Sequence, residues 1–450
     1  VVPMGYARRI AHVHPNFNSA ISMAPVTKSA EPVTTADEIS NIMRRAFTRL
    51  RNGRGGPVLV EVPTDLINAE ISGELDYTPV YRTRGGPDPA DVTRAAAMLA
   101  AAKRPVIYAG QGVHYAEAWP QLRELAERLA APVTTSLQGK SAFPEDHPLA
   151  LGSGGRAIPK PVHHFLGAAD LIFGIGCSFT ETNFGVSMPA GKTIIHATLD
   201  AMDLNKDLPS DLGLIGDAGL TLEALNAEIE ELLDGPREAE AVTAEIAGVR
   251  EAWLAEWRPK LTSDEVPLSP YRVLSDLHET LDRDNTIITH DAGSPRDQIS
   301  PFWQATTPLS YIGWGKTTQL GYGLGLAMGA KLACPDKLCV NVWGDAAIGF
   351  TGMDFETAVR ERIPILSILF NNFSMAIELK VMPVSTEKFR STDISGDYAA
   401  MARAFGGYGE RVTEPAEIVP AIRRGIEQTQ NGVPALLEFI TAKEVEISSF

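Results

Sequence analysis

The segment between residues 338 and 372 constrains the fold most, because it predicts a complete strand–helix–strand unit. Residues 338–343 form a short apolar run typical of a buried strand, and residues 353–362 carry apolar side chains at helical spacing. A second apolar run covers residues 365–370. Two strands joined through a helix must run parallel, because the connection is too long for a hairpin. We therefore expect the residues that follow the two strands to lie on one edge of a parallel sheet.

Two polar residues stand directly after these strands, Asp345 after the first and Asn372 after the second. The carboxyl ends of parallel strands are where open α/β sheets bind ligands. A carboxylate, an amide oxygen and a backbone carbonyl from the loop after Asn372 form a hard oxygen site suited to Mg2+ or Ca2+, which normally shares its metal with phosphate. The loop at 346–352 opens a helix, whose free N–H groups also favour phosphate. Alone, each residue is more often a helix cap or a turn residue, but together they predict a metal and diphosphate site.

The pair Gly344-Asp345 followed by Asn372 resembles the diphosphate and metal motif of thiamine diphosphate enzymes. The wider sequence resembles the acetolactate synthase-like superfamily, which includes acetohydroxyacid synthase, pyruvate decarboxylase and oxalyl-CoA decarboxylase. The family usually has glycine at the position of Ala346, and alanine does not readily adopt a positive φ. The resemblance implies thiamine diphosphate and Mg2+ as cofactors, with Asp345, Asn372 and the backbone oxygen of Ser374 as the metal ligands.

The same resemblance implies further cofactor contacts. Ser294 would donate a hydrogen bond to the diphosphate, and the carbonyl of Thr318 would accept one from the cofactor's amino group. Leu320 stands where the family places a bulky apolar residue that bends the cofactor, with core packing as the alternative role. Ile377 would lie against the thiazolium ring. The full predicted cofactor-binding set is Ser294, Thr318, Leu320, Gly344, Asp345, Ala346, Ala347, Asn372, Ser374 and Ile377.

Glu378 is the predicted catalytic residue. In decarboxylating relatives, a glutamate at this distance from the metal ligand faces the reacting carbon and relays protons. A partly desolvated carboxylate in such a place has a raised pKa, as a general acid needs. The alternative is an exposed glutamate on a helix.

The alternation of strands and helices predicts an α/β fold of successive doubly wound parallel sheets with flanking helices. The run GRGGPVLVEVPTDL resembles the last part of the family's pyrimidine-binding domain, and ADLIFGIGCSF resembles part of its central domain. The predicted segments are a C-terminal remnant of the pyrimidine-binding domain at 1–71, a linker at 72–87, a central domain at 88–230, a helical connector at 231–266 and a diphosphate-binding domain at 267–450.

Two helical segments carry more specific expectations. The glycines at 321, 325 and 329 recur every four residues, which predicts a helix face without side chains that presses closely on its neighbour. The acidic, Ala-rich segment at 218–260 predicts helices that are mainly solvated.

The earlier part of the pyrimidine-binding domain is not found in this sequence. In the family, that part carries the glutamate that activates the cofactor, and Glu31, Glu38 and Glu61 lie in the wrong part of the resemblance to replace it. The chain is therefore either a fragment or one that receives the missing half-domain from a separate chain. Because the family builds its site between two subunits, we expect a homodimer or a homotetramer.

Composition and charge narrow the partners and the compartment. A net charge of -16 argues against a nucleic-acid surface, which needs a basic patch. No apolar stretch reaches the length of a membrane span, and the first residues lack the core of a signal peptide. The cysteines at 177, 334 and 339 show no metal-ligand spacing, so we expect buried thiols in a cytoplasmic protein.

The resemblance implies an enzyme that decarboxylates or carboligates a 2-oxo acid. The nearest alternative is a 2-hydroxyacyl-CoA lyase or an oxalyl-CoA decarboxylase-like enzyme, which takes an acyl-CoA. An alternative of another class is a non-catalytic, cofactor-binding partner subunit. FAD or ADP on the central domain is a weaker expectation, because the glycine pairs at 110 and 112 and at 174 and 176 do not complete a GxGxxG motif. Tight strand–helix turns are the alternative explanation of these glycines.

Overall fold

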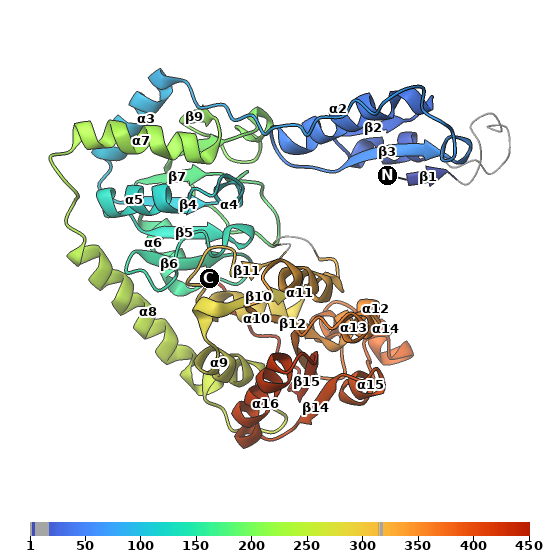
Figure 1. The fold of residues 1–450 in the computed structure, drawn as a ribbon. Helices are drawn as coiled ribbons and strands as arrows, with labels where there is room; N and C mark the ends of the chain where they lie inside the picture. Colours follow the sequence, from blue (N-terminus) through green and yellow to red (C-terminus); the bar gives the residue numbers. More distant parts are fainter. Residues whose placement is uncertain (1, 5–17, 314, 316–317) are drawn as a thin grey trace. The chain divides into compact units, whose positions relative to one another are not determined.

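The computed structural model describes residues 2–4, 18–313, 315 and 318–450, and the chain divides into two compact units, Val1–Gly86 and Pro87–Phe450 (Figure 1). The prediction about a signal peptide falls on the first residues, of which 1 and 5–17 lie outside the described part. Among the described helices, none has both the length and the apolar character that crossing a bilayer requires.

The first unit contains a small parallel sheet with the strand order β1-β3-β2. Helix α2 packs on this sheet through Ile42 and Ala46, which lie one turn apart and contact Val33 and Val60. The elements are β1 (Val2–Met4), α1 (Ser19–Met23), β2 (Ser29–Pro32), α2 (Ile39–Arg51) and β3 (Val58–Pro63). This core is small, because few apolar side chains are available to it.

The second unit begins with a six-stranded parallel sheet in the order β6-β5-β4-β7-β8-β9. Alternate residues of β4 face opposite sides, so Ile107 packs with α3, α5 and α7, whereas Val106 and Tyr108 pack on the side of α6. The strands are β4 (Pro105–Ala109), β5 (Val133–Ser136), β6 (Ala150–Gly154), β7 (Leu171–Ile175), β8 (Thr193–Thr198) and β9 (Leu212–Ile215). The helices are α3 (Pro89–Ala101), α4 (Gly112–Ala116), α5 (Trp119–Leu129), α6 (Lys160–Ala168) and α7 (Ala218–Leu232).

A second six-stranded parallel sheet follows, in the order β11-β10-β12-β13-β15-β14. One face packs on α9, α10 and α16, and the other face packs on α11, α12, α13 and α15. The strands are β10 (Thr286–His290), β11 (Tyr311–Ile312), β12 (Leu338–Gly344), β13 (Leu366–Asn371), β14 (Tyr408–Val412) and β15 (Ala435–Ile440). The helices are α9 (Pro270–Thr280), α10 (Ser294–Phe302), α11 (Tyr322–Ala333), α12 (Asp345–Thr351), α13 (Asp354–Arg360), α14 (Pro383–Phe389), α15 (Tyr398–Ala404) and α16 (Ile418–Gln430). The predicted fold class is therefore confirmed.

The two large sheets lie within the predicted segments 88–230 and 267–450, and the boundary between the two units falls at the end of the predicted linker. The exact domain boundaries stay predictions.

Helix α8 (Glu240–Leu261) and the last residues of the chain join the two large sheets (Figure 1). Trp253 and Trp257 of α8 are buried against Tyr271 and α10. The indole N–H of Trp253 donates to the hydroxyl of Ser448 (2.9 Å), which donates in turn to the carbonyl of Ile158 (2.7 Å). Only Ile246, Trp253 and Trp257 of α8 are buried, so most of this helix is solvated as expected. The expectation fails for α7, which packs on the central sheet.

The glycines of α11 also differ from expectation. Gly325 and Gly329 are exposed, and a Cβ at either position would meet no atom of the described residues within 4 Å. A close approach also occurs at Gly323, where a Cβ would lie 2.4 Å from Oδ1 of Asn341 and 2.9 Å from the carbonyl of His290. Of the three glycines in the four-residue repeat, Gly321 does press closely on a neighbour, because a Cβ there would lie 2.8 Å from Cβ of Phe350.

Candidate active site

A pocket opens at the carboxyl edge of the C-terminal sheet, at the point where the strand order reverses. Strand β11 lies on one side of β10 and β12 lies on the other, so the chain winds in opposite directions from β10. Crevices of this kind are the usual ligand sites of open α/β sheets. Residues that follow β10, β12, β13 and β15 line the pocket, and the space between them, counted together with the open solvent at the mouth, is about 570 Å3.

Asp345 holds the loop that follows β13. Its carboxylate is buried, and Oδ2 accepts hydrogen bonds from the backbone N–H groups of Asn372 (3.1 Å) and Ser374 (3.2 Å). Strands β12 and β13 are parallel neighbours, so the predicted meeting of the two strand ends is confirmed. Burial raises the pKa of the Asp345 carboxyl above its ordinary value, and the backbone N–H donors oppose this shift by favouring the ionised form.

A divalent cation fits this set of donors. Among the described residues, Oδ1 of Asn372 and Oγ of Ser374 are buried without a hydrogen-bond partner. A buried oxygen without a partner is costly unless a ligand satisfies it. One carboxylate with amide and carbonyl oxygens is a donor set typical of Mg2+ and Ca2+. No three His, Cys, Asp or Glu side chains gather into a metal site elsewhere in the described part of the chain.

All of the predicted cofactor-binding residues except Thr318 line this pocket. Ser294 begins α10, Leu320 precedes the turn into α11, and Ile377 lies in the turn after Ser374. Thr318 is exposed and does not line the pocket, and its neighbours 316 and 317 lie outside the described residues. The roles assigned to these side chains remain predictions.

Ala346 is compatible with the local backbone. The segment 346–352, expected as a loop, is helical almost throughout, because α12 begins at Asp345 itself. Ala346 therefore has ordinary helical geometry, and it is absent from the described residues with positive φ. The alanine in place of the family's glycine consequently introduces no backbone strain.

Glu378 lies in a 3-10 turn, Ala376–Leu379, and lines the pocket beside Ile377. Its side chain is half-buried, so the alternative of an exposed helical glutamate does not describe it. Within the described part of the chain, its carboxylate makes no ion pair and no hydrogen bond. A carboxylate in that state is free to exchange a proton with a bound molecule.

Asp291 supports the pocket from β10 in a way that the sequence analysis missed. Oδ1 accepts from the N–H of Gly321 (2.8 Å), and Oδ2 accepts from the N–H of Gly323 (3.0 Å). These bonds fix the start of α11 and the turn that follows Leu320. Burial raises the pKa of the Asp291 carboxyl. The signal in the sequence was the same as for Asp345, an aspartate directly after an apolar strand.

At the carboxyl edge of the central sheet, the turns that carry the two glycine pairs pack closely on each other. A Cβ at Gly110 would lie 2.3 Å from the carbonyl oxygen of Gly176, so these glycines allow two turns to touch. The ring of Phe179 lies over Gly174 and stacks on Tyr108 at 5.5 Å between centroids. Close packing of the turns therefore accounts for both glycine pairs, and no phosphate-binding geometry is needed to explain them.

Two protein-family models match the second unit. The model described as "Thiamine pyrophosphate enzyme, central domain" matches residues 92–225, and the model described as "Thiamine pyrophosphate enzyme, C-terminal TPP binding domain" matches residues 291–439. The second match covers Asp345 and Asn372 together with the loop between Ser374 and Glu378.

Individual proteins match over nearly the whole chain. The chain is 28% identical over 436 residues to a probable acetolactate synthase large subunit of Methanococcus aeolicus. This match covers 92% of this chain and 72% of that protein. It is 27% identical over 451 residues to glyoxylate carboligase of Escherichia coli O157:H7, with 94% and 74% covered. Its fold is similar to that of benzoylformate decarboxylase from Polynucleobacter necessarius, with a TM-score of 0.80 and 22% identity over 98% of this chain and 81% of the other.

Proposed function

Because the chain belongs to the thiamine pyrophosphate enzyme family, we propose that it is a thiamine diphosphate- and Mg2+-dependent lyase or transferase that decarboxylates or carboligates a 2-oxo acid. The observation that carries this proposal is the pairing of a buried Asp345 carboxylate with the unpartnered Oδ1 of Asn372 at the switch point of the sheet. Support for the reaction class comes from the names of the relatives, which include an acetolactate synthase, a glyoxylate carboligase and a benzoylformate decarboxylase.

The residues of the pocket take separate roles in this proposal. Asp345, Asn372 and the backbone oxygen of Ser374 would hold Mg2+, and Ser294 would donate to the diphosphate. Leu320 would exclude water beneath the cofactor. Thiamine diphosphate, when bound, supplies the electron sink for breaking or forming the bond next to the substrate's carbonyl group.

Two further residues would complete the site around the reacting atoms. Ile377 would hold the thiazolium ring, and Glu378, half-buried at the same pocket, would give a proton to or take a proton from the substrate. We also propose that the chain acts as a homodimer or a homotetramer, because enzymes of this family build the active site between two subunits.

Calorimetric titration of the purified protein with thiamine diphosphate, in Mg2+ and in EDTA, tests the binding site directly. We expect binding that requires Mg2+ and that Asp345→Asn weakens by more than 100-fold, since residues that only orient a metal ligand already change affinity by about 10–100-fold. Asp354→Asn, at the exposed start of α13, is the matched control and should bind as the unmodified protein does.

Assays with pyruvate, glyoxylate and benzoylformate then test the reaction. Release of carbon dioxide or formation of a carboligation product supports the proposal. Turnover of oxalyl-CoA alone would favour the acyl-CoA alternative, and cofactor binding without any turnover would favour a non-catalytic partner subunit. A protein that binds no thiamine diphosphate in the presence of Mg2+ would contradict the proposal.

A further inference from the structure

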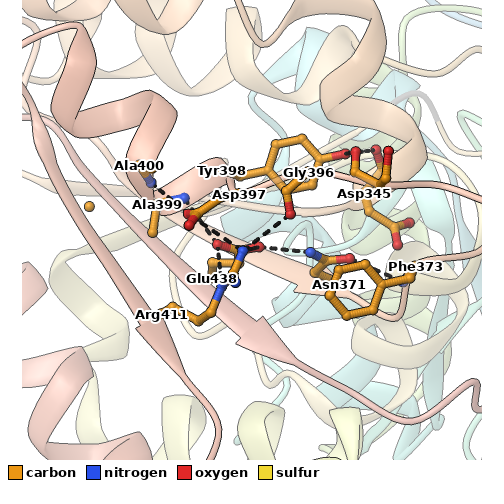
Figure 2. Close-up of polar contacts among 12 residues, drawn as sticks. Asp345, Asn371, Phe373, Gly396, Asp397, Tyr398, Ala399, Ala400, Arg411 and Glu438 are labelled. Atoms are coloured by element: carbon orange, nitrogen blue, oxygen red, sulfur yellow. Dashed lines mark hydrogen bonds and ion pairs between the residues drawn. The ribbon is translucent and has the colours of Figure 1, made fainter.

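Glu438 is a buried carboxylate inside an otherwise apolar strand, β15. It pairs in register with Leu369 of β13 on one side and with Arg411 of β14 on the other. Because paired residues share a face of the sheet, the side chains of Glu438, Arg411 and Asn371, which is two residues beyond Leu369, all project from one face. Figure 2 shows these side chains converging on Glu438.

Every oxygen of this carboxylate is engaged. Oε1 accepts from the amide Nδ2 of Asn371 (2.7 Å) and from Nη2 of Arg411 (3.0 Å). Oε2 accepts from Nε of Arg411 (3.1 Å) and from the backbone N–H of Ala399 (3.0 Å). The bidentate guanidinium contact balances the charge and fixes the plane of the carboxylate.

The carboxylate sets the orientation of the Asn371 amide. An ionised carboxylate can only accept hydrogen bonds, so the NH2 group of Asn371 must face Glu438 and its Oδ1 must face the other way. Oδ1 accepts there from the backbone N–H of Phe373 (3.1 Å). Phe373 has a φ of 57°, in the left-handed region that a bulky residue rarely adopts. The Asn371 side chain thus stabilises a strained turn.

That turn presents the metal ligands. Asn372 lies within it and Ser374 follows it, and the N–H groups of both residues reach Asp345 only because the backbone reverses at Phe373. A second contact holds Asp345 at its backbone, because the hydroxyl of Tyr398 donates to the carbonyl of Asp345 (3.3 Å) (Figure 2). Tyr398 begins α15, and the next residue of that helix is Ala399, which Glu438 binds.

We propose that Glu438 is a positioning residue for the metal site, acting on the Asn372–Ser374 loop through Asn371 and on Asp345 through the start of α15. The inference rests on the proposed function, because it takes Asp345, Asn372 and Ser374 as the metal ligands. It adds that the geometry of these ligands is set by a charged residue that does not itself line the pocket, on a strand whose following residues, Thr441 and Ala442, do. Residues that orient metal ligands in this way typically change metal affinity by about 10–100-fold when they are replaced.

Two single variants and their combination test the proposal. Glu438→Gln removes the charge that orients Asn371, and Asn371→Ala removes the link to the loop while the contacts of Glu438 with Arg411 and Ala399 remain. The measurement is the Kd for Mg2+ at a saturating concentration of thiamine diphosphate, by calorimetry, together with the thermal unfolding temperature of the metal-free protein. We expect each variant to raise the Kd for Mg2+ by 10–100-fold. A high Mg2+ concentration should restore thiamine diphosphate binding to the level of the unmodified protein.

The double variant shows whether Glu438 acts through Asn371. If it does, Glu438→Gln combined with Asn371→Ala should raise the Kd for Mg2+ little more than Glu438→Gln alone, because residues in one network are not additive. Should Glu438→Gln fail to fold, Asn371→Ala decides the matter alone, since it removes the same link by truncating one side chain.

Glu410→Gln is the matched control. Glu410 lies on β14 next to Arg411, and Oε2 of its carboxylate accepts from Nε of Arg424 (3.1 Å). Within the described part of the chain, neither side chain forms a hydrogen bond or an ion pair with the loop or with α15. This variant should lower the unfolding temperature while its Kd for Mg2+ stays within twofold of the unmodified protein. The control therefore separates lost stability from lost positioning.

The outcomes distinguish this inference from the function on which it rests. The positioning role is wrong, and the proposed function stands, if the unmodified protein binds thiamine diphosphate with Mg2+ and both single variants have the same Kd for Mg2+ as the unmodified protein. If the effects of the two variants add in full, Glu438 does not act through Asn371. If the unmodified protein shows no Mg2+-dependent binding, the proposed function falls and the inference falls with it.

Discussion

The contact between α11 and the C-terminal sheet leads to a sharp prediction for Gly323→Ala. The added methyl group would lie 2.4 Å from Oδ1 of Asn341, and 2.9 Å from a backbone oxygen that cannot move without shifting β10. Such overpacking costs about 1–3 kcal/mol. Moving α11 also weakens the hydrogen bond from the N–H of Gly323 to Asp291, a charged acceptor worth about 1.5–3 kcal/mol. Alanine returns about 1 kcal/mol of helix propensity. The net expected destabilisation is about 2–4 kcal/mol.

Hydrogen exchange of the buried amides of β10 and β12 measures this effect, because it reports the stability of the sheet segment that α11 covers. Gly323→Ala should reduce protection there by roughly 30-fold or more, since each 1.4 kcal/mol is a factor of ten. Gly325→Ala on the same helix, where nothing lies within 4 Å, should leave protection unchanged or raise it by up to about 1 kcal/mol. Equal protection in the two variants would show that the close approach at Gly323 is not tight, and would refute the reasoning.

Three further predictions concern single side chains. Burial lowers the pKa of His290 to about 4, so the folded state resists a proton that the unfolded chain accepts below pH 6.5. The apoprotein should therefore lose up to about 3 kcal/mol of stability as the pH falls from 6.5 to 4, and denaturation at several pH values should show a smaller loss in His290→Gln. Glu378→Gln should lower kcat with little change in the calorimetric Kd for thiamine diphosphate, and an unchanged kcat would remove Glu378 from proton transfer. Glu145→Gln leaves the buried ammonium of Lys140 without a charged partner and should cost about 3–5 kcal/mol in thermal or chemical unfolding. Lys140→Met with Glu145→Gln should recover part of that loss, because the uncompensated charge is gone and the amide oxygen still accepts from the N–H of Ala305.

The edge of the pocket that carries Asp345 and Asn372 could be predicted from the sequence, because the connection between their strands was enough to place it. Once the connection between the strands required a parallel pair, Asp345 and Asn372 had to meet, whatever the rest of the sheet looked like. The sequences of β4, β7, β8 and β10 are apolar runs typical of buried strands. Strand β6 carries no such signal, because its sequence ALGSG has neither β-branched residues nor alternation.

The contacts that hold this edge from behind, above all that of Glu438 with Asn371, could not be predicted in the same way. Glu438 contacts Asn371 only because β15 lies next to β13, and the sequence does not specify that neighbour. The sequence contains one signal for this contact, a charged residue inside an apolar strand, and such a residue usually has a buried partner. The buried tryptophans of α8 stand among acidic residues that suggested a solvated helix, and two of the three glycines in the repeat of α11, Gly325 and Gly329, are exposed. In each case, whether a residue is buried or paired depends on its neighbours in the folded chain, which the local sequence pattern does not specify.

The fastening of the last residues onto the central sheet has a practical consequence for protein engineering. The hydroxyl of Ser448 is hydrogen-bonded to both Ile158 and Trp253, whereas Phe450 is about half exposed. An affinity tag fused after Phe450 should leave freely into solvent, but a chain cut back before Ser448 would open the seam between the two large sheets and release Trp253 into water.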